Sequence, residues 1–155
     1  MSAATERQLG SPRGNLILDL FVLDQRVGEL MEVALDGTGV RPAEYAVYSQ
    51  LGPAPLTPRQ ISKRLGLTSS TLSGYLAAME RRGDVRRLDN PDDGRSYRVE
   101  LTAEGKARLR TCRTAFRRAM RALDRALPRP ADELREGLAM IDAAAAEAIS
   151  SLRAT

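Results

Sequence analysis

Residues 57–102 constrain the fold of this chain most, because the periodicity of their apolar side chains changes from a helical to a strand pattern within one short stretch. Up to about residue 81, apolar residues recur every three or four positions, in two short runs separated by Gly66. After Gly83 they alternate with polar residues, which is the pattern of β-strands. The stretch therefore predicts two short helices joined by a tight turn and followed by a hairpin.

The predicted first helix has local signals at both ends. Thr57 is a hydroxyl N-cap, and Pro58 stands at the first helical position, where its missing N–H costs no hydrogen bond. Gln60, three residues after the cap, completes a capping box. Gly66 permits the left-handed backbone that ends the helix, and Thr68 is the N-cap of the next one.

The second helix has an apolar face and an unusual outer face. Its apolar face is formed by Leu72, Tyr75, Leu76 and Met79. The opposite face carries small or hydroxylic side chains, namely Ser69, Ser70, Ser73, Gly74 and Ala77. Such a face suits close approach to another surface, and the major groove of DNA admits a helix.

Residues 85–89 and 96–101 are predicted to be the two strands of the hairpin. The connector at residues 90–94 is a cluster of turn-forming residues. We therefore expect a mainly α fold with a small β-hairpin wing, that is, a winged helix-turn-helix flanked by long helices.

At this point the chain resembles the MarR family of bacterial transcriptional regulators. The resemblance covers nearly the whole chain. The segments that carry it are Arg41-Pro42-Ala43-Glu44-Tyr45, Leu65-Gly66-Leu67, the hydroxyl run from Thr68 to Thr71, Met79-Glu80-Arg81-Arg82-Gly83, Pro91-Asp92-Asp93-Gly94-Arg95, and Leu101-Thr102-Ala103-Glu104-Gly105. The last two are the most specific.

The resemblance implies a set of DNA-contacting residues. The wing residue Arg95 would enter the minor groove, oriented by Asp93. Lys63 and Arg64 would contact phosphates, which position a protein without reading sequence. The residues that would face bases and phosphates from the second helix are Ser69, Ser70, Thr71, Ser73 and Gly74. Many family members carry Arg at the position of Gly74 and Asp at that of Ala77, so recognition here would depend more on hydroxyls, backbone groups and groove shape.

Three amphipathic helices are expected around this module, at residues 15–35, 103–127 and from 132 onward. Together they present more apolar surface than one subunit readily hides, which favours a homodimer, as the resemblance also implies; a monomeric bundle is the alternative. The predicted dimerisation residues are Leu16, Leu20, Leu23, Leu138, Ile141 and Ile149. The expected division is a flexible tail at residues 1–14, a dimerisation helix at 15–40, the DNA-binding domain at 41–102, and dimerisation helices at 103–155.

Composition excludes several classes of function. The chain has no His and one Cys, so a structural zinc site and a His-dependent catalytic triad have no side chains to form them. No phosphate-binding glycine loop is present, and we expect neither an enzyme nor a cofactor. Cys112 lies on an apolar helical stripe and is interpreted as core, with an oxidation sensor as the alternative.

The expected function is that of a DNA-binding regulator. A net charge of +4 permits binding to nucleic acid. There is neither a membrane-length apolar run nor a signal peptide, and a lone Cys fits a reducing cytoplasm. The sequence predicts a cytoplasmic repressor that binds double-stranded DNA at a pseudo-palindromic operator as a homodimer. By the resemblance, a small-molecule effector would release it. The alternative is a protein-interaction winged helix or antirepressor with little DNA binding.

Overall fold

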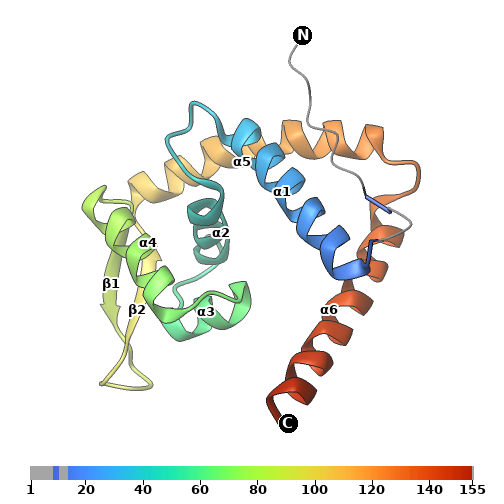
Figure 1. The fold of residues 1–155 in the computed structure, drawn as a ribbon. Coiled ribbons are helices and arrows are strands. Elements are labelled where there is room, and N and C mark those ends of the chain that lie inside the picture. Colours follow the sequence, from blue (N-terminus) through green and yellow to red (C-terminus); the bar gives the residue numbers. More distant parts are fainter. Residues whose placement is uncertain (1–8, 11–13, 155) are drawn as a thin grey trace. The chain divides into compact units, whose positions relative to one another are not determined.

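The fold is mainly α-helical, with one antiparallel hairpin in the described part of the chain (Figure 1). The structure is a computed structural model and describes residues 9–10 and 14–154. The elements are α1 (Leu16–Leu35), α2 (Pro42–Leu51), α3 (Pro58–Leu65), α4 (Ser69–Arg81), β1 (Val85–Asp89), β2 (Tyr97–Leu101), α5 (Ala103–Ala126) and α6 (Ala131–Ala154). The expected fold class, a winged helix-turn-helix with long flanking helices, is confirmed.

The chain divides into two compact units, of which the first ends at Arg117 and the second begins at Arg118. The first contains α1 to β2 and α5 as far as Arg117, and the second contains the rest of α5 and α6. Residues 1–8 and 11–13 of the predicted tail lie outside the described residues.

Local capping explains where the first unit's helices begin and end. The Asn15 side chain accepts a hydrogen bond from the Leu18 N–H at 3.1 Å and caps α1. At α3 the predicted capping box is present: the Thr57 N–H donates to Gln60 Oε1 at 2.8 Å, and the Gln60 N–H donates to Thr57 Oγ1 at 3.2 Å. Gly66 has a φ of 65°, as the predicted left-handed turn requires.

The core of the first unit is formed by α2, α3, α4, the hairpin and the start of α5. Val47 and Tyr48 of α2 are fully buried in it. They pack with the inner residues of α4 and of the hairpin, which are Leu72, Leu76, Met79, Val85, Val99 and Leu101. In Figure 1, α3, α4 and the hairpin gather around α2. The core therefore holds α4 with its inner face buried and its outer face free.

One part of the hairpin differs from the prediction. Val85 pairs with Leu101 and Asp89 with Tyr97, so β2 begins at Tyr97 rather than at residue 96. The reason is that the Ser96 N–H donates to the Asp93 carbonyl at 3.0 Å within the turn, and so cannot serve the strand ladder. An isolated bridge between Leu56 and Val99 attaches the segment before α3 to the outer edge of β2.

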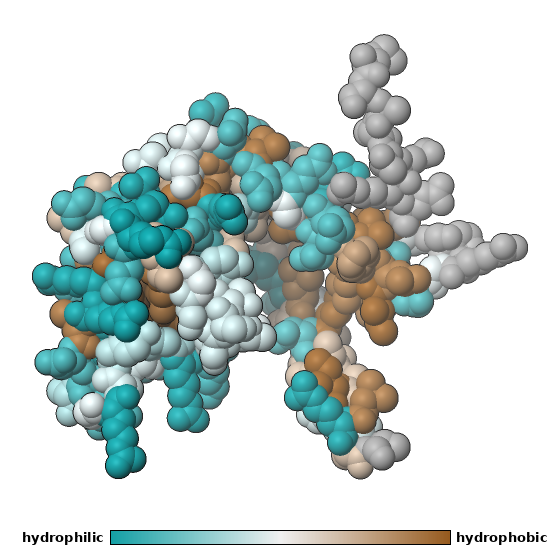
Figure 2. Space-filling model, turned by 60° about the vertical axis from the view of Figure 1, so that its left-hand side comes forward, coloured by the Kyte–Doolittle hydropathy of each residue, from teal (hydrophilic) through white to brown (hydrophobic). Residues whose placement is uncertain are grey.

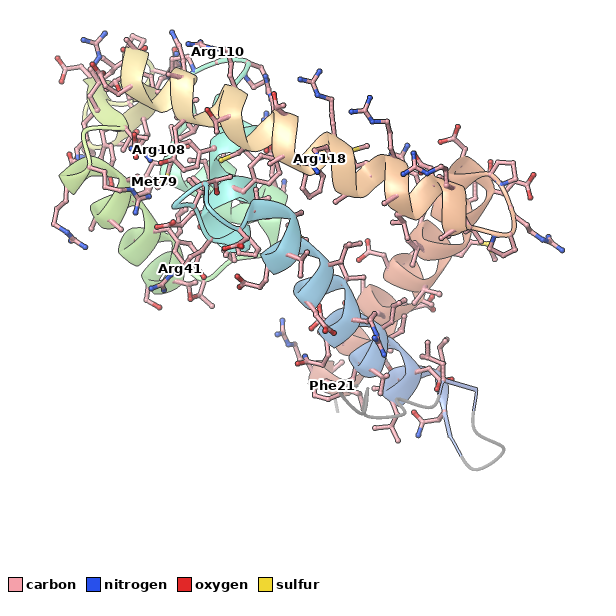
Figure 3. The ribbon with its side chains drawn as sticks, turned by 90° about the horizontal axis from the view of Figure 1, so that it is seen from above. Phe21, Arg41, Met79, Arg108, Arg110 and Arg118 are labelled. Carbon is pink, nitrogen blue, oxygen red and sulfur yellow. The ribbon has the colours of Figure 1, made fainter. Side chains whose placement is uncertain are left out.

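The flanking helices leave many apolar side chains exposed. On α1 these include Phe21, which points away from the helix ribbon in Figure 3. On α6, Leu138, Ile149 and Leu152 are exposed, and the C-terminal end of this helix shows hydrophobic surface in brown (Figure 2). None of the described helices combines the length and the apolar character needed to cross a membrane.

Candidate nucleic-acid interface

The outer face of α4 is exposed and rich in hydroxyls. All five α4 residues predicted to face DNA are exposed: Ser69, Ser70, Thr71, Ser73 and Gly74. Thr68 caps the helix by accepting from the Thr71 N–H at 3.2 Å, and its hydroxyl lies 2.8 Å from that of Thr71. The structure therefore brings several hydroxyls together at the positive end of the helix dipole, a place that favours anions.

Tyr75 departs from its predicted role on the buried face. Leu72, Leu76 and Met79 are buried as predicted, but Tyr75 is only partly buried and packs at the margin of the core. It borders a cavity on the side of α4, together with the loop that precedes α2. The helical spacing correctly predicted that Tyr75 lies on the inner side of α4. It did not predict the cavity that leaves Tyr75 only partly buried.

The wing presents one arginine without an ionic partner. Arg95 is exposed, and its backbone N–H donates to Asp93 Oδ1 at 3.0 Å. Arg98, in contrast, donates to Asn90 Oδ1 at 3.1 Å and forms an ion pair with Asp92. Within the described residues no carboxylate pairs with the Arg95 guanidinium. The turn is thus fixed by Asp93 through the backbone, and the Arg95 side chain is available to an external anion.

Two of the basic residues of α3, Lys63 and Arg64, lie in its last turn and are exposed. Arg64 Nη1 donates to Gln50 Oε1 at 3.5 Å, a long hydrogen bond that restrains the side chain weakly. Lys63 and Arg64 are therefore on the surface of the same unit as the hydroxyl face of α4 and the wing.

A buried ionic network, which the sequence reasoning missed, joins the end of α4 to α2 and α5. At its centre is Asp84, which is fully buried. Its carboxylate accepts from Tyr48 Oη at 2.6 Å, from Arg82 Nε at 3.1 Å and from Arg108 Nε at 3.0 Å. Arg82 also donates from both terminal nitrogens to Glu44 Oε1, each at 3.1 Å. No local pattern reveals this network, because Tyr48 and Arg108 lie 36 and 24 residues from Asp84.

The network sets the ionisation of its members. Burial alone would raise the pKa of Asp84, but hydrogen bonds from Tyr48, Arg108 and Arg82 outweigh burial and hold that pKa below its usual value. For Tyr48, burial and the hydrogen bond to Asp84 raise the pKa well above the usual range of a phenol. Asp84 is therefore a carboxylate and Tyr48 a neutral phenol at neutral pH, as their hydrogen bond requires.

The chain is similar to known proteins both in sequence and in fold. Residues 38–96 match the MarR family profile. The HTH-type transcriptional repressor YetL of Bacillus subtilis is 34% identical over 97 residues, which cover 61% of this chain and 58% of YetL. A probable transcriptional regulator from Pseudomonas aeruginosa superposes with a TM-score of 0.74 at 26% identity, covering 82% of this chain and 96% of that one. The chain is thus similar to the MarR family over its central residues.

A second similar structure contains DNA. The transcriptional repressor CouR, bound to a 23-mer DNA duplex, has a TM-score of 0.73 and 26% identity over 84% of this chain and 92% of its own. The predicted resemblance to the MarR family is thus confirmed, and these relatives are regulators by name. The chain matches about 58% of the length of YetL, the curated relative described above.

Cys112 has the environment of a core residue. It is fully buried, and burial raises the pKa of its thiol, which lowers the fraction of reactive thiolate. These observations favour the interpretation as core over that of an oxidation sensor.

Proposed function

We propose that this protein is a sequence-specific, DNA-binding transcriptional regulator. In this proposal it acts in the cytoplasm as a homodimeric repressor on a pseudo-palindromic operator and is released by a small-molecule effector. The observation that carries the proposal is the exposed hydroxyl face of α4 in the same unit as the unpaired Arg95 of the wing. The DNA-bound state of the similar repressor CouR supports it.

Each part of the surface has a distinct role in the proposed complex. The small residues of α4 let the helix backbone approach base edges closely, and Ser69, Ser70 and Ser73 supply hydrogen bonds there. Lys63 and Arg64 would neutralise phosphates and set the register. Arg95 would insert into the minor groove, where its charge is favoured by the negative potential of a narrow groove.

A homodimer would double this surface. Four of the predicted dimerisation residues are exposed in the single chain, namely Leu16, Leu23, Leu138 and Ile149. Their exposure supports a second chain that covers them. Two copies of α4 would then read half-sites about 10 bp apart on one face of a duplex.

The test is a titration of the DNA upstream of the protein's own gene, at several salt concentrations. In the Arg95→Ala variant we expect an affinity loss of at least about tenfold, with a salt slope shallower by about 1 to 2 because each dimer loses two cations. The matched control is Arg110→Ala, since Arg110 is an exposed arginine of α5 that points away from the fold in Figure 3. Equal losses for the two variants would remove the wing from the interface, and wild-type affinity no better than for random DNA would refute specific binding.

A second candidate function is a protein-interaction winged helix or antirepressor. The small outer face at Gly74 and Ala77 favours it, because such a face also suits a protein partner. Co-purification of a related regulator together with undetectable DNA affinity would support this alternative over the first proposal.

A further inference from the structure

The end of α4 is closed by a turn that fixes Asp84 to the helix. The Asp84 N–H donates to the Met79 carbonyl at 2.9 Å, and the Gly83 N–H donates to the Glu80 carbonyl at 2.9 Å. Together with the left-handed φ of 74° at Gly83, these two bonds form a Schellman motif. Because both bonds are made to the last turns of α4, Asp84 moves with this helix as one body.

The start of α5 is bonded to the same turn. The Thr102 N–H donates to the Asp84 carbonyl at 3.0 Å, and the Thr102 hydroxyl donates to the Gly83 carbonyl at 2.6 Å. The same hydroxyl accepts from the Gly105 N–H at 3.1 Å and so caps α5. A Cβ at Gly105 would lie 2.0 Å from the Asp84 carbonyl oxygen, so the backbones are in close contact. The first turn of α5 therefore has no room to slide over the end of α4.

Arg108, in the second turn of α5, adds an ionic link to this backbone contact. Its Nε donates to Asp84 Oδ1 at 3.0 Å. Figure 3 shows Arg108 on the side of α5 towards α4, whereas Arg110 projects away from the fold. Asp84 is fully buried, and removing one partner of a buried ion pair is costly. Rotation of α5 about its own axis would have to break this pair, so the pair resists a change in the angle between α4 and α5.

The contact between these two helices bears on where α4 lies in a dimer. Helix α5 is continuous from Ala103 to Ala126 and passes from the first unit into the second. The second unit contains the predicted dimerisation residues of α6. In the proposed homodimer, each copy of α4 is thus attached to the α5 of its own subunit. A stiff attachment would make the distance between the two copies of α4 stiff as well.

We propose that Asp84 and Arg108 are positioning residues for operator recognition, whose ion pair fixes the angle between α4 and α5 and so makes the protein selective for one spacing of half-sites. Neither side chain touches DNA, and both act through α4. This inference rests on the proposed function, because spacing matters only to a dimer that binds two half-sites. One inserted base pair moves a half-site by about 3.4 Å and turns it by about 34° around the duplex. A stiff dimer cannot follow this change, whereas a loosened one can.

The test compares two operators that differ by one base pair inserted between the half-sites. Wild type should prefer the native spacing. In Arg108→Gln the ratio of the two affinities should shrink at least about fivefold, because the loosened α4 can follow the displaced half-site. A purely structural role would lower both affinities by the same factor. An unchanged ratio in Arg108→Gln would therefore overturn the proposal.

Three features make Arg108 the residue to change. Its side chain is one-third exposed, and Asp84 keeps its bonds from Tyr48 and Arg82 after the substitution, so the variant should remain folded. Arg108→Lys keeps the positive charge beside Asp84 and should restore most of the preference for the native spacing. The exposed neighbour gives the control Arg110→Gln, which should keep the wild-type ratio. A Lys variant no more selective than Arg108→Gln, or an equal change in Arg110→Gln, would contradict the role of this ion pair.

A measurement without DNA separates this inference from the proposed function. Spin labels at Ser73→Cys and Thr111→Cys, both at exposed positions, report the distance between α4 and α5 in a Cys112→Ala background. Labelled chains are diluted with unlabelled ones, so that each measured pair lies within one subunit. The distribution of distances should be narrow in the parent and wider with Arg108→Gln, but not with Arg110→Gln.

Each combination of results leads to a different conclusion. An unchanged distance distribution in Arg108→Gln would overturn the inference, whatever the protein does with DNA. A wider distribution with an unchanged ratio of operator affinities would overturn the role in spacing. A wider distribution in a protein that binds no operator at all would refute the proposed function and leave the link between α4 and α5 in place.

Discussion

Asp84 is a buried carboxylate that joins three side chains of the first unit. Its carboxylate is fully buried and accepts hydrogen bonds from Tyr48, Arg82 and Arg108. In Asp84→Asn the charge disappears while both guanidinium groups stay, so we expect the free energy of unfolding to fall by about 3 kcal/mol. Urea denaturation measures this. The exposed Asp89 gives the control Asp89→Asn, with an effect within about 0.5 kcal/mol. Similar effects for the two variants would contradict the assignment.

The pH dependence of the same variant follows from the direction of the pKa shift. Burial raises the pKa of Asp84, but the hydrogen bonds outweigh burial, so its pKa in the folded protein lies below its value of about 3.9 in the unfolded chain. The stabilisation is therefore complete above about pH 4 and is lost as the pH falls through the folded-state pKa. The stability difference between wild type and Asp84→Asn should be constant from about pH 8 to 5 and should shrink below about pH 4. A difference that persists unchanged in acid would mean that the carboxylate charge is not the source.

Gly105 is required for a different reason, namely a close approach of two backbone segments. A Cβ at this position would lie 2.0 Å from the Asp84 carbonyl oxygen, which accepts the Thr102 N–H at 3.0 Å and cannot easily move. We expect Gly105→Ala to lower the free energy of unfolding by about 1–3 kcal/mol. At Gly74, where the added Cβ is unobstructed, Gly→Ala should instead stabilise α4 by about 0.5–1 kcal/mol. Thermal unfolding of both variants checks the difference, and a stabilised Gly105→Ala protein would contradict the geometry.

At the scale of single elements, local capping fixes where helices α3 and α4 begin. In α3 the side chains of Thr57 and Gln60 satisfy each other's backbone N–H groups. Thr57→Ala should lower the free energy of unfolding by about 1 kcal/mol. The exposed Thr111, in the middle of α5, gives the control Thr111→Ala, which should be neutral or slightly stabilising because Ala favours helices. Denaturant titrations of the two variants compare them, and equal midpoints would show that the capping box contributes nothing.

These local signals explain why much of the fold could be predicted from sequence. Thr57, Gly66 and Thr68 act through residues next to them, and the alternation of Val99 and Leu101 needs only the strand itself. The network around Asp84 could not be predicted, because its partners meet only after the chain has folded. The same holds for the cavity beside Gly74: the sequence showed a small residue on an exposed face, and only the fold shows that Arg41 lies nearby. Of the predicted site, the exposure of the hydroxyl residues is established by the fold, while their contacts with DNA remain a proposal.

At the scale of the whole molecule, two parts of this chain differ in how much apolar surface they leave exposed. From α2 to β2, the large apolar side chains pack in one core. The helices α1 and α6 do not, since Leu16, Leu23, Leu138 and Ile149 are each more than one-third exposed, whereas Leu20 and Ile141 are partly buried. On α6, no residue in the described range is buried at all. We expect a second copy of the chain to cover this surface. The proposed spacing between the two copies of α4 depends on this dimer.

Leu138 provides the sharpest test of the dimer. It is 51% exposed on the predicted contact stripe of α6, whereas Met140 is 74% exposed and lies about 200° further around the same helix. A charge at a contact position must be buried on association, so Leu138→Glu should shift the protein from dimer towards monomer in sedimentation experiments. Met140→Glu adds the same charge to the opposite face and should leave the dimer intact. Operator affinity should fall with the loss of the dimer, because a single half-site then has to supply all the binding free energy. A wild-type protein that sediments as a monomer at micromolar concentration, or a Leu138→Glu variant that remains fully dimeric, would remove this stripe from the interface.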